Sequence, residues 1–253
     1  MDPELYVKRY SAAEILSLSW DLVKKNTALL LAIILSVYLP VNIIVSLIPE
    51  TILAAEAFMP GFRIYAMLIL AIQTLIVLIA DLALVYAVKE LIEGRKTDYR
   101  NALRQSLKRW PAAVGTEMIM AVFLAGLFIL FIIPGIIFAV YWSFALFAVM
   151  IRNKSGTFAL SYSRSLVKGR WWKVLGYSVS FGLLSFLPVI PFLVLWFMMP
   201  KDPFTDLLYS TVSNISMSFY TVAWTVYFLN LDTVKEEKKQ VADERKEPVI
   251  NRL

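Results

Sequence analysis

The sequence predicts an all-α membrane protein with six transmembrane helices, three cytosolic amphipathic interfacial helices and an approximate threefold internal repeat. Of the 253 residues, 59% are hydrophobic and 17% are charged, whereas soluble domains are about half apolar and about a quarter charged. The mean hydropathy is +0.68. Similar short segments also precede three pairs of apolar stretches, and this pattern predicts the repeat.

One helical bundle is expected rather than two domains, because no long polar linker separates the apolar stretches. Residues 1–232 are expected to form a single transmembrane domain, and residues 233–253 a charged cytosolic tail. The first apolar stretch follows a charged segment and lacks a small-x-small cleavage site, so no cleaved signal peptide is expected.

The first predicted unit opens with a capping box at Ser11-Ala-Ala-Glu14, which begins an amphipathic surface helix that ends at Asn26. A span over about residues 28–47 is long enough to cross the ~30 Å hydrocarbon layer. Pro40 should kink it. A loop at residues 49–61 is expected on the far side of the membrane.

The chain then returns as one long helix over about residues 64–91, which Gly94 closes. A second, strongly basic surface helix is expected over about residues 97–110. The next two spans, over about 111–132 and 136–151, are predicted to form a tight hairpin.

Ile133-Pro134-Gly135 is the expected turn of that hairpin. The third unit begins with a surface helix at residues 157–168, which Gly169 stops. A fifth span, at about 174–198, contains Pro188 and Pro191 and should break near its outer end. A sixth is expected at about 207–231. The tail that follows reads as solvated and disordered.

The repeat is clearest between Leu160–Lys168, LSYSRSLVK, and Leu16–Lys24, LSLSWDLVK, which agree at six of nine positions. A weaker copy lies at Ala102 to Ser106. The predicted units are about 11–92, 97–151 and 157–231. A small residue at one shared position, Ser19, Ser106 and Ser163, would allow close helix packing. The alternative is that amphipathic helices rich in Leu, Ser and Lys resemble one another by composition alone.

Most Lys and Arg residues lie on one side of the membrane if the predicted spans cross it. On this assignment 23 of the 25 Lys and Arg residues lie on one side, and Arg63 and Lys201 lie opposite. The positive-inside rule then places both termini and all three surface helices in the cytoplasm. The same cations could bind anionic lipid headgroups. The candidate headgroup contacts are Arg100, Arg104, Lys108, Arg164, Lys168 and Arg170.

Several segments together resemble a known family. They are Leu16–Asn26, Ile133–Ile136, Ala159–Trp172, and Tyr227 ahead of Leu231-Asp232. This combination resembles a six-helix prokaryotic integral membrane family that includes the membrane domain attached to some glycerophosphodiester phosphodiesterases. The resemblance implies a fold and a membrane location. It carries no catalytic residue onto this chain, because the His and acidic metal ligands of the soluble phosphodiesterase domain have no counterpart here.

The chain contains no Cys and no His, which excludes disulfides, Cys and His metal sites and His-based acid–base catalysis. No phosphate-binding loop, dinucleotide fingerprint or nucleophile elbow is present. We therefore expect no enzyme, with an intramembrane enzyme the least favoured possibility, and no cofactor or metal. The basic residues flank apolar spans, so no nucleic acid partner is expected either.

Two acidic residues, Asp81 and Glu117, lie well inside predicted spans. A carboxylate at that depth costs roughly 2.5–3.5 kcal/mol on insertion scales, so it usually faces the bundle interior. The candidate polar interior consists of Asp81, Glu117, Gln73, Asn214 and Ser218. The alternatives are that the acids only bridge helices, and that the Ser and Thr residues of the last span only pack closely against neighbours.

Two functions follow from these features. The first is a transport or lipid-handling module whose polar interior includes Asp81 and Glu117. The alternative is a non-transporting structural or accessory protein whose basic surface helices bind anionic lipid or a partner protein.

Overall fold

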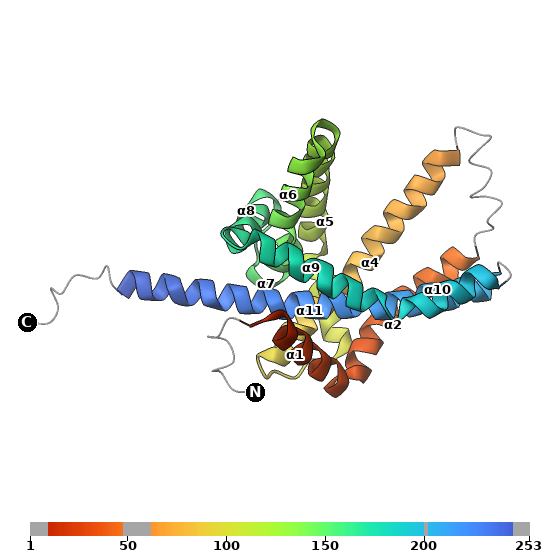
Figure 1. Ribbon diagram of the computed structural model, residues 1–253. Helices are drawn as coiled ribbons and strands as arrows, with labels where there is room; N and C mark the ends of the chain where they lie inside the picture. The colour runs from red at the N-terminus through yellow and green to blue at the C-terminus, as the bar shows by residue number, and fades with distance from the viewer. Residues whose placement is uncertain (1–9, 48–61, 200–201, 245–253) are drawn as a thin grey trace, which may run out of the picture.

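The computed structural model describes residues 10–47, 62–199 and 202–244, and these form helices joined by short connections (Figure 1). The predicted loop at 49–61 lies outside the described residues. Helix α1, Ala12–Lys25, begins with the predicted capping box, in which Ser11 and Glu14 bond to each other's backbone N–H groups. It ends at Asn26, and α2, Thr27–Ser46, follows directly with Pro40 inside it.

Helix α4, Phe62–Ile92, is the long returning helix that the sequence predicts. Gly94 follows it with a φ of 73°, a left-handed conformation that favours glycine. The chain then turns into α5, Tyr99–Leu130, which Asp98 caps by accepting a hydrogen bond from the Asn101 backbone.

Two predicted boundaries in the second unit are wrong. The basic surface helix and the third span are one continuous helix, α5, which runs through Pro111 without ending. The turn of the hairpin lies at Phe131, which has extended backbone geometry, and Pro134 belongs to the first turn of α6, Ile132–Trp142. A proline is tolerated there because the N–H groups of a first helical turn need no intrahelical acceptor.

The predicted fourth span is also interrupted. Helix α6 ends at Trp142, and α7, Ala145–Arg152, begins after a short turn at Ser143 and Phe144. The hydroxyl of Ser163 accepts a hydrogen bond from the Phe144 N–H and donates one to the Tyr141 carbonyl, so it satisfies backbone groups at this break.

The third unit follows the prediction closely at its start. Helix α8, Gly156–Val167, ends before Gly169, whose φ is 80°. Helices α9, Trp171–Phe186, and α10, Val189–Met198, meet at Pro188 with a bend of 51°.

The last helix, α11, extends over Pro203–Glu244, well beyond the predicted span. The segment after Asp232, expected to be disordered, is helical as far as Glu244. Its Glu, Lys, Gln and Ala residues are strong helix formers, which explains why the helix continues past the apolar part.

Four helical stretches of the described chain are long and apolar enough to cross a membrane: Thr27–Ser46, Met67–Ile92, Tyr99–Leu130 and Ile132–Arg152. The bent pair of α9 and α10 would make a fifth if it forms one broken span. Several long apolar helices of this kind are typical of a multi-pass membrane protein.

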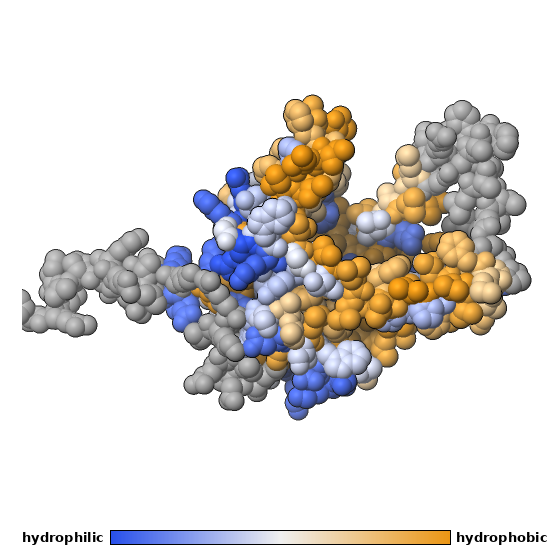
Figure 2. Space-filling model, in the orientation of Figure 1, coloured by the Kyte–Doolittle hydropathy of each residue, from blue (hydrophilic) through white to orange (hydrophobic). Residues whose placement is uncertain are grey.

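Helix α11 lies at the centre of the molecule and packs against α1, α2, α4, α9 and α10 (Figure 1). Its aromatic residues Trp224 and Phe228 stack on Phe144 and Phe147, which come from the α6–α7 break and from α7. The tip of the α5–α6 hairpin and the surface of α9 and α10 are covered with apolar side chains (Figure 2). Such an exposed apolar surface suits contact with lipid rather than water.

Candidate functional site

A row of polar side chains runs between α2, α4 and α11, and its central member is Asp81 of α4. The Tyr38 hydroxyl of α2 and the Thr221 hydroxyl of α11 each donate a hydrogen bond to Asp81 Oδ1, both at 3.4 Å. Three helices that are distant in sequence therefore contribute to one polar contact. Because each partner is a neutral hydroxyl, no cation compensates the carboxylate charge directly.

The row continues about one turn further along α2. Asn42, only 3% exposed, donates to the Thr211 hydroxyl at 3.3 Å and accepts from the Asn214 side chain at 3.1 Å. Asn42 lies four residues after Tyr38, so both side chains point toward α11. The hydroxyl of Ser218, also buried, donates to the Asn214 carbonyl. We call Tyr38, Asn42, Asp81, Thr211, Asn214, Ser218 and Thr221 the polar seam.

A cavity of about 260 Å³ lies beside the polar seam. Asp81 and Thr221 line one side, and Ser143, Phe147 and Trp224 line the rest with other residues of α4, α7 and α11. The Trp224 indole donates to the Ser143 carbonyl at 3.3 Å. The cavity therefore connects the carboxylate with the break between α6 and α7.

The two other predicted interior residues on α4 and α5 are less enclosed. Glu117 is half-buried on α5, and its charge is close enough to interact with that of Asp81. Gln73 is half-buried on α4, two helical turns before Asp81. Within the described ranges, neither side chain forms a hydrogen bond or an ion pair. The structure thus places Asp81, Asn214 and Ser218 in one seam and leaves Gln73 at its margin.

A second hollow, of about 690 Å³, lies where α8 turns into α9. It is lined by three cations, Lys168, Arg170 and Lys173. Six aromatic side chains, one of which is Tyr10, also line it. The left-handed Gly169 reverses the chain, so cations from both sides of the turn reach the same hollow. Among the residues that the structure describes, no acidic side chain lines it. We call it the basic pocket.

The remaining candidate headgroup residues are spread over the surface. Arg100, Arg104 and Lys108 are exposed along the first part of α5. Arg164 is exposed on α8, and its guanidinium lies over the rings of Phe138 and Tyr141. Of the six predicted headgroup residues, the structure therefore brings only Lys168 and Arg170 into a common hollow.

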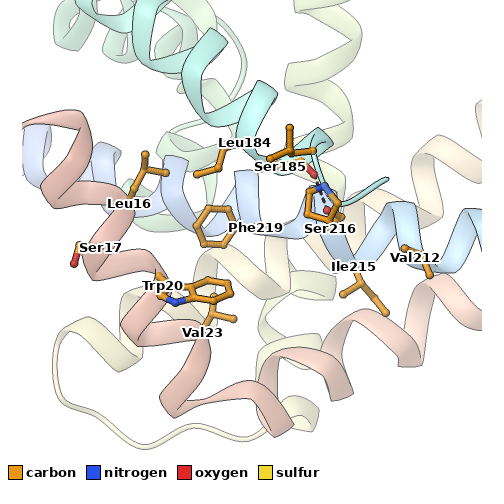
Figure 3. Close-up of a pocket in the computed structure, with 12 residues that line it drawn as sticks. Leu16, Ser17, Trp20, Val23, Leu184, Ser185, Val212, Ile215, Ser216 and Phe219 are labelled. Carbon is orange, nitrogen blue, oxygen red and sulfur yellow. Dashed lines mark hydrogen bonds between the residues drawn. The ribbon is translucent and has the colours of Figure 1, made fainter. Parts of the chain in front are cut away.

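A third hollow is apolar and measures about 740 Å³. Leu16 and Trp20 of α1, Leu184 of α9 and Phe219 of α11 gather around it (Figure 3). Ser185 also lines it. The side chain of Ser185 is 2% exposed, and its hydroxyl has no hydrogen-bond partner. We call this hollow the apolar cavity.

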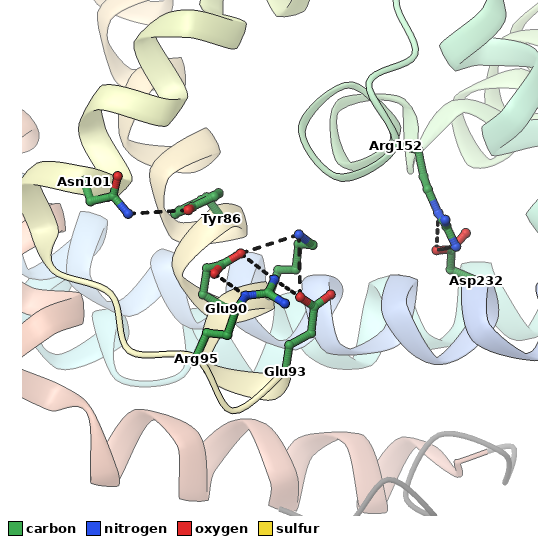
Figure 4. Close-up of polar contacts among 8 residues, drawn as sticks. Tyr86, Glu90, Glu93, Arg95, Asn101, Arg152 and Asp232 are labelled. Carbon is green, nitrogen blue, oxygen red and sulfur yellow. Dashed lines mark hydrogen bonds and ion pairs between the residues drawn. The ribbon is translucent and has the colours of Figure 1, made fainter.

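Two groups of ion pairs hold the ends of the helices (Figure 4). Arg95 bonds to Glu90 at 2.6 Å and also to Glu93, which closes the loop after α4. Asp232, 3% exposed, accepts a hydrogen bond from Arg152 Nε at 2.6 Å, forms an ion pair with the same guanidinium, and accepts a hydrogen bond from the Tyr162 hydroxyl. The second group ties α7 and α8 to α11.

The three serines predicted at equivalent repeat positions are each completely buried. The hydroxyl of Ser19 donates to the Ile15 carbonyl, that of Ser106 to Leu103, and that of Ser163 to Tyr141. Each position thus accommodates a small residue in close contact with neighbouring helices.

Sequence reasoning missed Tyr38, Asn42 and Asp232. A detectable signal existed for Asn42, because an amide inside an apolar stretch is as exceptional as Gln73 or Asn214. Tyr38 reads as an ordinary interfacial aromatic residue. Among the described residues, no three His, Cys, Asp or Glu side chains come together as a metal site requires.

One comparison with known proteins gives a match. A family model described as Domain of unknown function (DUF7847) matches residues 105–231. That range contains Glu117, the break between α6 and α7, and the cations of the basic pocket, whereas Asp81 lies before it. No curated protein and no solved structure matches the chain.

Proposed function

We propose that this chain, which belongs to the family described as Domain of unknown function (DUF7847), is a cytoplasmic-membrane protein that crosses the bilayer six times and moves or holds a polar or lipid substrate at Asp81. The observation that carries the proposal is the polar seam itself. A carboxylate in an apolar helix, bonded from two other helices and bordering a cavity, is the arrangement that substrate and ion pathways use.

Six crossings require that the α9–α10 pair and the first part of α11 each span the membrane. Both are supported by their length: the pair covers Trp171–Met198 despite its bend, and residues 207–231 of α11 are as long as the other spans. The polar seam lowers the apolar character of α11, as expected for a helix that faces a bundle interior rather than lipid.

The resemblance to membrane domains attached to phosphodiesterases supports the proposed membrane location. In this chain the two termini would lie in the cytoplasm, since the positive-inside rule places the basic surface helices there.

The polar seam could bind a substrate by exchanging the hydrogen-bond partners of Asp81. Tyr38 and Thr221 bond to Asp81 at 3.4 Å, a long distance for a hydrogen bond to a carboxylate. A substrate with a hydroxyl or ammonium donor could therefore replace them at little cost. The nearby charge of Glu117 disfavours a second anion and favours a proton or a cation at this depth.

The test uses purified protein in vesicles with two probes. One is proton entry driven by a potassium-diffusion potential and reported by a trapped pH dye. The other is transbilayer movement of a fluorescent phospholipid, followed by chemical quenching of the outer leaflet.

We expect wild-type protein to accelerate one of these two processes, and Asp81→Asn and Glu117→Gln to reduce that rate at least tenfold. Asp21→Asn, at an exposed position on α1, is the matched control. Unchanged rates in both interior variants would refute the role of the seam.

The second candidate function is a non-transporting protein that binds anionic lipid or a protein partner. The row of exposed cations at Arg100, Arg104 and Lys108, with Arg164 on α8, favours it. Neutralising Arg100, Arg104 and Arg164 together should then reduce the lipid or partner recovered when the protein is purified from membranes. Equal recovery with and without these charges would contradict this function.

A further inference from the structure

The basic pocket and the apolar cavity follow one another along the same two helices, α9 and α11, and we call the two hollows together the groove. On α11, the residues that line them follow a single stripe at helical spacing: Val212, Ile215, Ser216 and Phe219 in the apolar cavity, then Tyr227 and Asn230 in the basic pocket. Helix α9 lines both hollows as well, with Trp171–Tyr177 at one end and Leu184–Leu187 at the other. The segment from Tyr10 to Val23 lies along the same groove.

The two ends of the groove differ sharply in character. Three cations and two tyrosine rings at Tyr177 and Tyr227 surround one end. The other end is lined almost entirely by aliphatic and aromatic groups. Such a groove matches an amphiphile with an anionic head and a long apolar chain, because each part of the ligand meets its own kind of surface.

The length of the groove also fits. Tyr227 and Ser216 are separated by eleven residues of one helix, which corresponds to about 16 Å at a rise of 1.5 Å per residue. One leaflet of a ~30 Å hydrocarbon layer is about 15 Å thick. An acyl chain whose headgroup lies at the basic pocket would therefore reach the apolar cavity.

We propose that this groove binds one anionic phospholipid, with its phosphate between Lys168, Arg170 and Lys173 and one acyl chain in the apolar cavity. The proposal rests on the second candidate function, lipid binding, and gives it a defined site. Trp172, 79% exposed beside the cations, anchors the entrance at the membrane interface.

The experiment compares binding of phosphatidylglycerol and phosphatidylcholine with identical acyl chains to the purified full chain in detergent micelles, by titration followed through tryptophan fluorescence. Glycerol phosphate, a headgroup analogue without a chain, is the third probe. Wild-type protein should prefer phosphatidylglycerol by at least tenfold, and glycerol phosphate should not compete.

Three variants locate the site. Lys168→Gln with Lys173→Gln should remove most of the preference, by roughly fivefold for each cation and about 30-fold for both. Both residues are exposed, so folding should be preserved. The control pair, Lys96→Gln with Lys239→Gln, makes the same charge change at exposed positions that line neither hollow. Ile215→Trp fills the apolar cavity and should weaken the binding of both phosphatidylglycerol and phosphatidylcholine.

Each contrary result has a distinct meaning. Equal losses in the two charge pairs, or unchanged binding in Ile215→Trp, would overturn the groove while leaving diffuse lipid binding as a function. Competition by glycerol phosphate would overturn it in favour of a free anion site. No preference in the wild-type protein would refute both the groove and the second candidate function.

Discussion

At the scale of single residues, a buried polar contact at Asp232 joins α7, α8 and α11. Its carboxylate is buried and accepts hydrogen bonds from Arg152 and Tyr162. Hydrogen bonds to a charged partner contribute about 1.5–3 kcal/mol each. This contact joins helices from two predicted repeat units, so it should contribute to the cohesion of the whole bundle.

We expect Asp232→Asn to lower the free energy of unfolding by about 2 kcal/mol, because Arg152 would lose its charged acceptor. Asp21→Asn, at an exposed position, should change it by less than about 0.5 kcal/mol. Unfolding in detergent mixtures with increasing dodecyl sulfate, followed by circular dichroism, measures both. Equal effects would show that the Arg152 contact does not stabilise the fold.

Tyr162 gives this contact a pH dependence. Burial raises the pKa of the Tyr162 hydroxyl, and the hydrogen bond to Asp232 raises it further. Because the folded pKa lies above the unfolded value near ~10, its contribution to stability is complete below about pH 10 and is lost as pH rises above it. Lys235, whose pKa is lowered mainly by burial, acts in the opposite direction over the same range.

Tyr162→Phe should therefore cost about 1 kcal/mol at pH 7, from the lost hydrogen bond. The gap between wild type and variant should narrow as pH rises from about 10 to 11, since the wild-type tyrosine becomes ionised on unfolding. Unfolding free energies at pH 7, 10 and 11 test this. A gap that stays constant with pH would contradict the assigned pKa direction.

Single residues also show where sequence reasoning ends. Asp81, Asn214 and Ser218 can be selected because polar groups are costly in apolar spans. The residues that bond to Asp81 cannot be selected in this way. Tyr38 lies 43 positions before Asp81, and Thr221 lies 140 positions after it. No spacing rule connects different helices, so the polar seam becomes visible only once the helices are packed.

At the scale of elements, proline was the least reliable sequence signal for where a helix breaks. Pro188 marks a true bend of 51°, whereas Pro111 lies inside a continuous helix and Pro134 lies in a first helical turn. The ring removes one N–H in every case. Whether the helix breaks depends on whether neighbouring helices support the freed carbonyl, and sequence does not reveal that.

The hairpin of α5 and α6 depends on a small residue near its turn. A Cβ added at Gly135 would lie 2.6 Å from the Phe128 ring of the facing helix. Gly135→Ala should therefore force the ring to move and lower the unfolding free energy by about 1–2 kcal/mol. Gly126→Ala, where a Cβ would meet no atom within 4 Å, is the control and should be neutral or slightly stabilising. Comparable losses in both variants would show that the close contact is unimportant.

At the scale of the whole molecule, composition alone predicted a membrane protein with long apolar helices, and the structure contains several helices that are long and apolar enough to cross a membrane. The buried serines at Ser19, Ser106 and Ser163 occupy similar environments, yet the elements around them differ. In the first unit one residue separates the surface helix from the span, in the second the two are a single helix, and in the third three residues separate them. The threefold repeat therefore stays a prediction.

The number of crossings and their direction can be measured directly, because the chain contains no Cys. Single cysteines at Asp98, Lys168 and Lys239 would each be the only thiol present, and all three positions are exposed. If the chain crosses six times with its basic surface helices in the cytoplasm, none of the three should react with a membrane-impermeant maleimide in intact cells, and all should react after lysis. A cysteine at Lys201, which lies outside the described residues, should react in intact cells.

The pattern among these sites separates the competing topologies. Five crossings would leave Asp98 and Lys168 protected but expose Lys239 on the outer surface, because the chain would then cross once less before its tail. If Lys201 also reacts in intact cells, the α9–α10 pair crosses the membrane, and the result places the last helix on the membrane surface instead of through it. It would also remove Asn214 and Thr221 from the bilayer interior, so the polar seam around Asp81 could no longer form a path across the membrane.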